Sequence, residues 1–197
     1  VNSEIASMEL SQFIKIARGD GPADLLLKGG SIVDVFSGEV YAADVAIADG
    51  KIVGIGSNYQ AKETIDVSGS VIAPGFIDAH VHIESSLVPP PQFARAVVPH
   101  GTTSVVIDPH EIANVLGLDG IRYMFDAAKY NPLSVFVMVP SCVPATNMET
   151  SGAVLHSYDL VSFKQDRWVL GLAEMMNFPG VVFGDEPTVK LDDHGFD

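Results

Sequence analysis

The chain has 197 residues, 47% of them hydrophobic and only 18% charged, which suits one medium domain or two small ones. Its net charge of −14 at pH 7 argues against a nucleic acid or an anionic membrane surface as a partner. The single cysteine, Cys142, excludes an intrachain disulfide and fits a reducing, cytoplasmic compartment.

The first third of the chain predicts a helix followed by a small β-rich segment. Apolar residues recur at helical spacing over residues 3–18, before two glycines. Asp49-Gly50 is the strongest hairpin signal. Short strands are expected at residues 25–27, 31–35, 44–47, 51–55, 64–67 and 71–73. We therefore expect an N-terminal helical segment over 1–21 and a small β-sandwich segment over 22–73.

From Pro74 onward, strand-like runs alternate with helical patterns, which is typical of parallel β/α units. The expected strands are 75–83, 102–108, 134–139 and 168–175, and the expected helices are 90–98, 112–130 and 157–165. The predicted fold class is α/β. Residues 74–184 would form the first four units of a (β/α)8 metal-dependent hydrolase barrel, and 185–197 an uncertain tail.

A complete barrel needs eight β/α units and roughly 250 residues. We therefore expect this chain to be a fragment, a truncated product or one half of a nicked enzyme. An open half barrel leaves sheet edges and part of the core uncovered, so it would need the missing C-terminal half as a partner. Assembly into a homo-oligomer is also expected.

Two histidines, His80 and His82, lie at the end of the first expected barrel strand. Side chains alternate between the two faces of a strand, so both imidazoles point to one side and can chelate a divalent metal. Such a metal could activate water for hydrolysis. The alternative is a chance pair on a solvated strand. The alternating apolar residues Ile77, Ala79, Val81 and Ile83 predict a strand buried on its other face, which favours a metal, because unpartnered polar groups are costly to bury.

Other polar residues also fall at the C-terminal ends of expected strands, where β/α barrels carry their chemistry. They are Glu84, Asp108, His110, Glu111, Ser141 and Glu174. Asp108 and Glu111 are typical either of a helix cap or of a pocket. Glu174 is either a surface residue or a metal-bound carboxylate. Glu84 is either a loop residue or a contact to substrate or ligands. His100 precedes a strand, so it is expected at the other end of the barrel.

Five motifs in order resemble the amidohydrolase superfamily and, within it, adenine deaminases of the bacterial and archaeal type. The motifs span residues 73–86, 101–103, 108–115, 140–146 and 171–177. The resemblance covers about residues 20–184. It implies a β/α barrel with a flanking β-sandwich, and an enzyme that converts adenine and water to hypoxanthine and ammonia.

The resemblance also implies a centre of two divalent metal ions, manganese or iron and sometimes zinc. His80 and His82 would match the first-strand ligands, and Glu174 the bridging carboxylate. Other matched positions would serve catalysis (His110 and Glu111) or substrate binding (Glu84 and Asp108). Further family ligands, two histidines and an aspartate on later strands, are not securely present here.

Two alternatives stay open at this point. Another amidohydrolase, acting on a cyclic amide, would be expected to carry a lysine where Glu174 stands. A non-catalytic barrel remnant would fit the missing second half, whereas the intact His80, His82 and Glu174 weigh against it.

Overall fold

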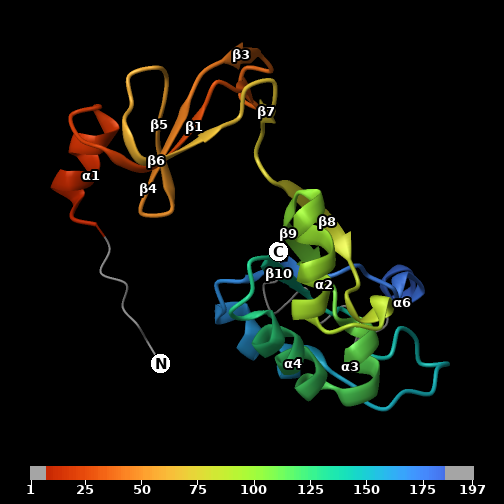
Figure 1. The fold of residues 1–197 in the computed structure, drawn as a ribbon. Helices are drawn as coiled ribbons and strands as arrows, with labels where there is room; N and C mark the ends of the chain where they lie inside the picture. Colours follow the sequence, from red (N-terminus) through yellow and green to blue (C-terminus); the bar gives the residue numbers. More distant parts are fainter. Residues whose placement is uncertain (1–7, 185–197) are drawn as a thin grey trace. The chain divides into compact units, whose positions relative to one another are not determined.

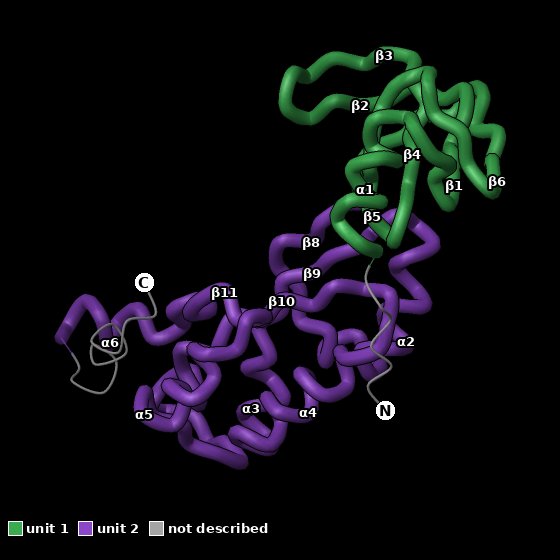
Figure 2. The backbone as a smooth tube through the Cα atoms, turned by 90° about the vertical axis from the view of Figure 1, so that its left-hand side faces the viewer, with its two compact units in different colours: residues 1–74 green, residues 75–197 purple. Residues whose placement is uncertain are grey.

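The computed structural model describes residues 8–184. By their internal contacts, the residues divide into two compact units, 1–74 and 75–197 (Figure 2). The tail expected over 185–197 and the first residues of the helix expected over 3–18 lie outside the described residues. Among residues 8–184, every helix is too short or too polar to cross a membrane.

The described part of the first unit contains one helix and seven short strands. They are α1 (Leu10–Ala17), β1 (Ala23–Lys28), β2 (Ser31–Val33), β3 (Val40–Ala42), β4 (Val45–Ala48), β5 (Lys51–Ile55), β6 (Ala61–Asp66) and β7 (Val71–Ile72). They form one sheet in the order β5-β4-β1-β6 and another in the order β3-β2-β7. The predicted hairpin is confirmed: Asp49 and Gly50 join β4 to β5 with positive φ angles of 51° and 68°. Strand β3 was not predicted.

The second unit alternates strands and helices (Figure 1). Its elements are β8 (Phe76–Val81), η1 (Glu84–Ser86), α2 (Pro90–Val97), η2 (Val98–His100), β9 (Thr102–Ile107), α3 (His110–Leu116), α4 (Leu118–Ala128), β10 (Ser134–Val139), α5 (Ser157–Leu160), η3 (Val161–Gln165), β11 (Val169–Leu172) and α6 (Phe178–Phe183). The strands form a parallel sheet in the order β11-β10-β9-β8. The α/β class is therefore confirmed, and the described strands form an open sheet rather than a closed barrel.

One face of this parallel sheet carries the core. Val105 and Ile107 of β9 are completely buried, and Val137 of β10 is only 1% exposed. They pack in one cluster with Met124 of α4 and Ala94 of α2. The intervening β9 residues are only partly buried, so the sheet presents a second, more open face. Because all four strands run the same way, their C-terminal ends meet along one edge.

Strand β8 differs from its prediction. We expected residues 75–83 to be buried on one side. Ile83, just after β8, is completely buried in the core cluster, but Ile77 near the start of the strand is 67% exposed. The start is exposed because, among the described strands, β8 pairs with β9 alone and forms an edge of the sheet. The burial that favoured the metal interpretation is therefore found only at the C-terminal end of the expected strand, beside the histidine pair.

The helix predicted over 112–130 is two helices, α3 and α4, separated at Gly117. Gly117 has a φ of 60° and a ψ of −138°, a backbone conformation that residues other than glycine rarely adopt. Likewise, the helix expected over 157–165 is α5 followed by the 3₁₀ helix η3. The fourth barrel strand, β11, ends at Leu172, so Glu174 lies in the following loop rather than on the strand.

The contact between α3 and α4 gives a stability prediction. A Cβ atom on Gly120 of α4 would lie 2.6 Å from the backbone oxygen of Ile112 in α3. Alanine normally stabilises a helix interior by about 1 kcal/mol relative to glycine. Here the obstacle is backbone, which cannot rotate away. We therefore expect Gly120→Ala to lower the free energy of unfolding by about 1–3 kcal/mol.

Urea unfolding followed by Trp168 fluorescence measures this difference. The control is Asp119→Ala at the exposed neighbouring position, which should change the free energy of unfolding by less than about 0.5 kcal/mol. A Gly120→Ala chain as stable as the unchanged chain, or more stable, would show that α3 and α4 can move apart freely.

Candidate metal centre

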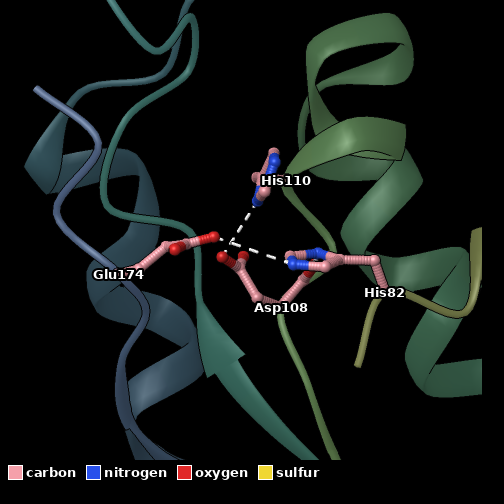
Figure 3. Close-up of side chains that lie close together, drawn as sticks. All are labelled: His82, Asp108, His110 and Glu174. Atoms are coloured by element: carbon pink, nitrogen blue, oxygen red, sulfur yellow. Dashed lines mark hydrogen bonds and ion pairs between the residues drawn. The ribbon is translucent and has the colours of Figure 1, made fainter. Parts of the chain in front are cut away.

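Four side chains meet just beyond the C-terminal ends of three strands (Figure 3). They are His82, Asp108, His110 and Glu174, and each offers one potential ligand atom within 4.8 Å of the others. His82 follows β8, Asp108 follows β9, and Glu174 follows β11. Residues far apart in sequence converge here because parallel strands bring their C-terminal ends to one edge of the sheet.

His80 and His82 lie side by side, as the strand periodicity predicted. Their Nε2 atoms are 3.0 Å apart, and their ring centroids are 4.9 Å apart. The Nδ1 atom of His82 lies 2.7 Å from the backbone oxygen of Asp108. A carbonyl oxygen can only accept, so Nδ1 carries a proton, and Nε2 is the ring nitrogen that faces the centre. Metal-binding histidines are commonly oriented in this way.

Glu174 completes a set of three converging donors. Its Oε1 atom lies 3.8 Å from His80 Nε2 and 3.7 Å from His82 Nε2. Ligand atoms bound at about 2.0–2.2 Å from one ion lie roughly 3–3.5 Å from one another. The separations observed here are close to that range, and the nitrogen and carboxylate donors suit a divalent transition metal. The residues present therefore fit a metal ion.

Asp108, which is buried, and His110, which is partly buried, form a pair beside these donors. His110 Nδ1 lies 2.9 Å from Asp108 Oδ2, and this hydrogen bond raises the pKa of His110 above its usual value. The Asp108 side chain is 2% exposed, and its Oδ1 atom has no hydrogen-bond partner among the described residues. A buried carboxylate oxygen without a partner is costly, so an additional positive group or donor is expected there.

The helix-cap alternative for Asp108 is wrong. Helix α3 begins at His110 and has Pro109 at its N-cap, where no side chain caps the helix. The Asp108 carboxylate instead binds the His110 ring, which belongs to the pocket.

Glu84 and Glu111 lie next to the cluster without belonging to the four-residue group. Glu84 Oε1 accepts a hydrogen bond from the backbone N–H of Ile112 at 3.4 Å, and burial raises the pKa of the Glu84 carboxyl. Ser85 Oγ donates to Glu111 Oε2. These two bonds hold η1 against the first turn of α3. The Glu84 Oε2 atom is buried and has no partner among the described residues.

His100 lies away from the cluster, as the sequence predicted. His100 is exposed in η2, immediately before β9, so it lies at the opposite end of the sheet from the cluster.

Ser141, which follows β10, is buried and donates a hydrogen bond from its Oγ atom to the backbone oxygen of Glu174. The sequence indicated that Ser141 lies at this end of the sheet, but not this contact.

Comparison with known proteins supplies the family. The amidohydrolase family profile matches residues 71–186. The adenine deaminase of Desulfatibacillum aliphaticivorans is 55% identical over 174 residues, which cover 88% of this chain and 30% of that protein. The adenine deaminase of Kosmotoga olearia is 50% identical over 184 residues, covering 92% of this chain and 32% of that protein. The chain thus spans about 30% of the length of these curated relatives.

A solved structure agrees at the level of the fold. Atrazine chlorohydrolase from Arthrobacter aurescens, complexed with zinc, matches with a TM-score of 0.54 and 18% identity over 72% of this chain and 43% of that one. The profile match covers more than half of the 197 residues, including all four strands of the parallel sheet. On this evidence, the chain belongs to the amidohydrolase family.

Proposed function

We propose that this chain is part of an enzyme that hydrolyses adenine to hypoxanthine and ammonia. The observation that carries the proposal is the convergence of His80, His82 and Glu174 at the C-terminal edge of the parallel sheet. The identity of 50–55% to proteins named adenine deaminase selects this reaction among those of the family. In the reaction, water adds to the ring carbon that bears the amino group, and ammonia leaves.

His80, His82 and Glu174 are the residues proposed to hold the metal, with two divalent ions, manganese or iron and alternatively zinc, as the expected content. A bound divalent ion would lower the pKa of a coordinated water and so supply hydroxide near neutral pH. The hydrogen bond from His82 Nδ1 to the backbone of Asp108 fixes the tautomer that this role requires.

The remaining residues are proposed to handle protons and substrate. His110 and Glu111 would move protons to the leaving amino group, since ammonia is a far better leaving group than amide ion. Asp108 was expected to contact the substrate, but its hydrogen bond to His110 supports a role in orienting that ring. Glu84 remains the proposed substrate contact. Its Oε2 atom is buried without a partner among the described residues, which leaves that oxygen available for a contact with substrate.

We also propose that the open sheet is the first half of an eight-stranded barrel, and that residues 22–73 are its β-sandwich segment. The exposed Phe76 and Ile77 on edge strand β8 support this arrangement, because the second half of a barrel would cover them. On this view the complete active site requires residues from the part of the relatives that this chain does not span.

The function is tested in a joined enzyme, in which this chain replaces the 30% of the Desulfatibacillum aliphaticivorans relative with which it aligns. We expect adenine to be turned over with a kcat/KM about a thousandfold or more above that for hydantoin or dihydroorotate, since polar sites reject substrates lacking their hydrogen-bonding groups. Faster cleavage of either cyclic amide would favour the other amidohydrolase activity. A folded, metal-loaded enzyme that turns over none of the three would favour the non-catalytic alternative.

Metal dependence gives a second expected result. Dialysis of the joined enzyme against a chelator should remove adenine deamination, because in the proposed reaction the metal activates the water that attacks adenine. Addition of Mn²⁺, Fe²⁺ or Zn²⁺ should restore hypoxanthine formation, measured by chromatography. The control is the same dialysis without chelator. Full activity in protein shown to be metal-free by elemental mass spectrometry would contradict the proposal.

A further inference from the structure

The loop that carries Glu174 is fixed by its backbone rather than by packing of its side chain. The Glu174 side chain is 48% exposed, and its carboxylate makes two long contacts, to His80 and to His82. A half-exposed carboxylate on a flexible stem keeps many rotamers unless its surroundings restrict them. The position of the carboxylate therefore depends on how well residues 173–177 are held.

Three successive bonds from the end of β10 hold this loop. The Ala173 N–H donates to the Val139 oxygen at 2.8 Å, which extends the strand pairing by one residue. Ser141 Oγ donates to the Glu174 backbone oxygen at 2.5 Å. The Asn177 N–H donates to Cys142 Sγ at 3.4 Å. The loop is thus held before, at and after Glu174.

Among the three, the Ser141 bond acts directly on Glu174. Ser141 is only 6% exposed, and its Oγ also lies 3.2 Å from Cys142 Sγ. A hydroxyl has one hydrogen, and the carbonyl oxygen is both nearer and a stronger acceptor than the thiol sulfur, so the hydrogen belongs on the Glu174 bond. The same Glu174 oxygen accepts from the Met176 N–H at 3.1 Å, which closes a tight turn just after the carboxylate-bearing residue.

We propose that Ser141 is a positioning residue: its hydroxyl fixes the Glu174 peptide and thereby directs the Glu174 carboxylate toward the Nε2 atoms of His80 and His82. This inference rests on the proposed metal centre for its function. Groups that orient a metal ligand through a hydrogen bond typically change metal affinity by about 10- to 100-fold when removed. Ser141 would act indirectly, through the main chain of Glu174.

The test uses the joined enzyme, unchanged and with each of three substitutions in the residues of this chain. Ser141→Ala removes the donor with almost no change in volume. Ser141→Thr keeps a hydroxyl and should restore the behaviour of the unchanged chain. Ser157→Ala is the matched control, because Ser157 is a serine of the same unit with a similar exposed fraction, 7% against 6%.

Two quantities are measured on each variant: amide hydrogen exchange of the peptide that covers residues 170–177, and the dissociation constant for Mn²⁺ and Zn²⁺ by calorimetry. We expect Ser141→Ala to speed exchange in this peptide about fivefold, the effect of losing one buried hydrogen bond. It should also weaken metal binding by about 10-fold or more. Ser141→Thr and Ser157→Ala should change neither quantity.

Each other result has a definite meaning. Unchanged exchange in Ser141→Ala overturns the inference, as does faster exchange with unchanged metal affinity, which would make the bond merely structural. If the joined enzyme without these substitutions binds neither metal, the proposed metal centre fails. Exchange of the 170–177 peptide then still decides whether Ser141 fixes the Glu174 loop.

Discussion

Replacing His82 with alanine should nearly abolish adenine deamination by the joined enzyme, lowering kcat/KM by about a thousandfold or more. His82 occupies the middle of the cluster. Its ring contacts His80 on one side and His110 on the other, with centroid distances of 4.9 Å and 4.7 Å. Its Nδ1 atom also binds the backbone of Asp108. The substitution therefore removes a proposed metal ligand and the ring that lies between those of His80 and His110.

The measurements are the steady-state rate of hypoxanthine formation and the metal content by elemental mass spectrometry. Metal content should fall together with activity. The matched control is His100→Ala, which removes an exposed histidine at the opposite end of the sheet and should leave both values unchanged. A His82→Ala enzyme that keeps its metal and more than a tenth of its activity would contradict the proposed role by a wide margin.

The second large effect is expected at Glu174. Glu174→Gln keeps the shape of the side chain and removes its negative charge. The proposed ligands His80 and His82 would bind a metal as neutral rings, so Glu174 would be the charged donor among the three. We expect kcat/KM for adenine to fall by about 100-fold or more, with weaker metal binding, because a neutral amide is a poor ligand for a divalent transition metal.

Calorimetric titration of metal into the metal-free joined enzyme separates the two effects. If excess metal restores most of the activity, the charge of Glu174 acts mainly on affinity; if it does not, the charge also matters after binding. The matched control is Glu149→Gln, at an exposed glutamate in the loop after β10, which should behave like the unchanged enzyme. Full activity of Glu174→Gln at low metal concentration would show that Glu174 is not a ligand.

The sequence predicted those parts of the fold that depend on local patterns. Strand β10 has the predicted bounds, 134–139, because its apolar residues form one uninterrupted run. The Asp49-Gly50 turn was equally clear, because both residues adopt the positive φ that such hairpins need. The prediction that His80 and His82 share a side needed only the period of a strand, and their rings do lie together.

The errors arise where distant parts of the chain decide the local structure. Helices α3 and α4 are separate because Gly117 adopts a conformation that the helical pattern of residues 112–130 does not reveal. Strand β8 looked buried from its apolar residues, but burial depends on what covers an edge strand. Asp108 fitted a cap pattern, whereas its partner is the ring of His110, two residues away.

The contacts within the site were the least predictable. Ser141 and Glu174 are 33 residues apart, and their hydrogen bond exists only because β10 and β11 are neighbours in the sheet. Likewise, the bond between Ser85 and Glu111 joins segments that follow two different strands. Sequence patterns indicated which end of the sheet these residues occupy. Their partners depend on strand order and on the loops that follow each strand.

We propose that a metal ion lies between the ends of β8 and β11, held by His80, His82 and Glu174. This placement can be tested by X-ray diffraction from crystals of the joined enzyme, recorded on both sides of the absorption edge of the bound metal. We expect an anomalous peak about 2.0–2.2 Å from both Nε2 atoms and from a Glu174 carboxylate oxygen. An active enzyme whose anomalous peaks all lie away from these three side chains would contradict it.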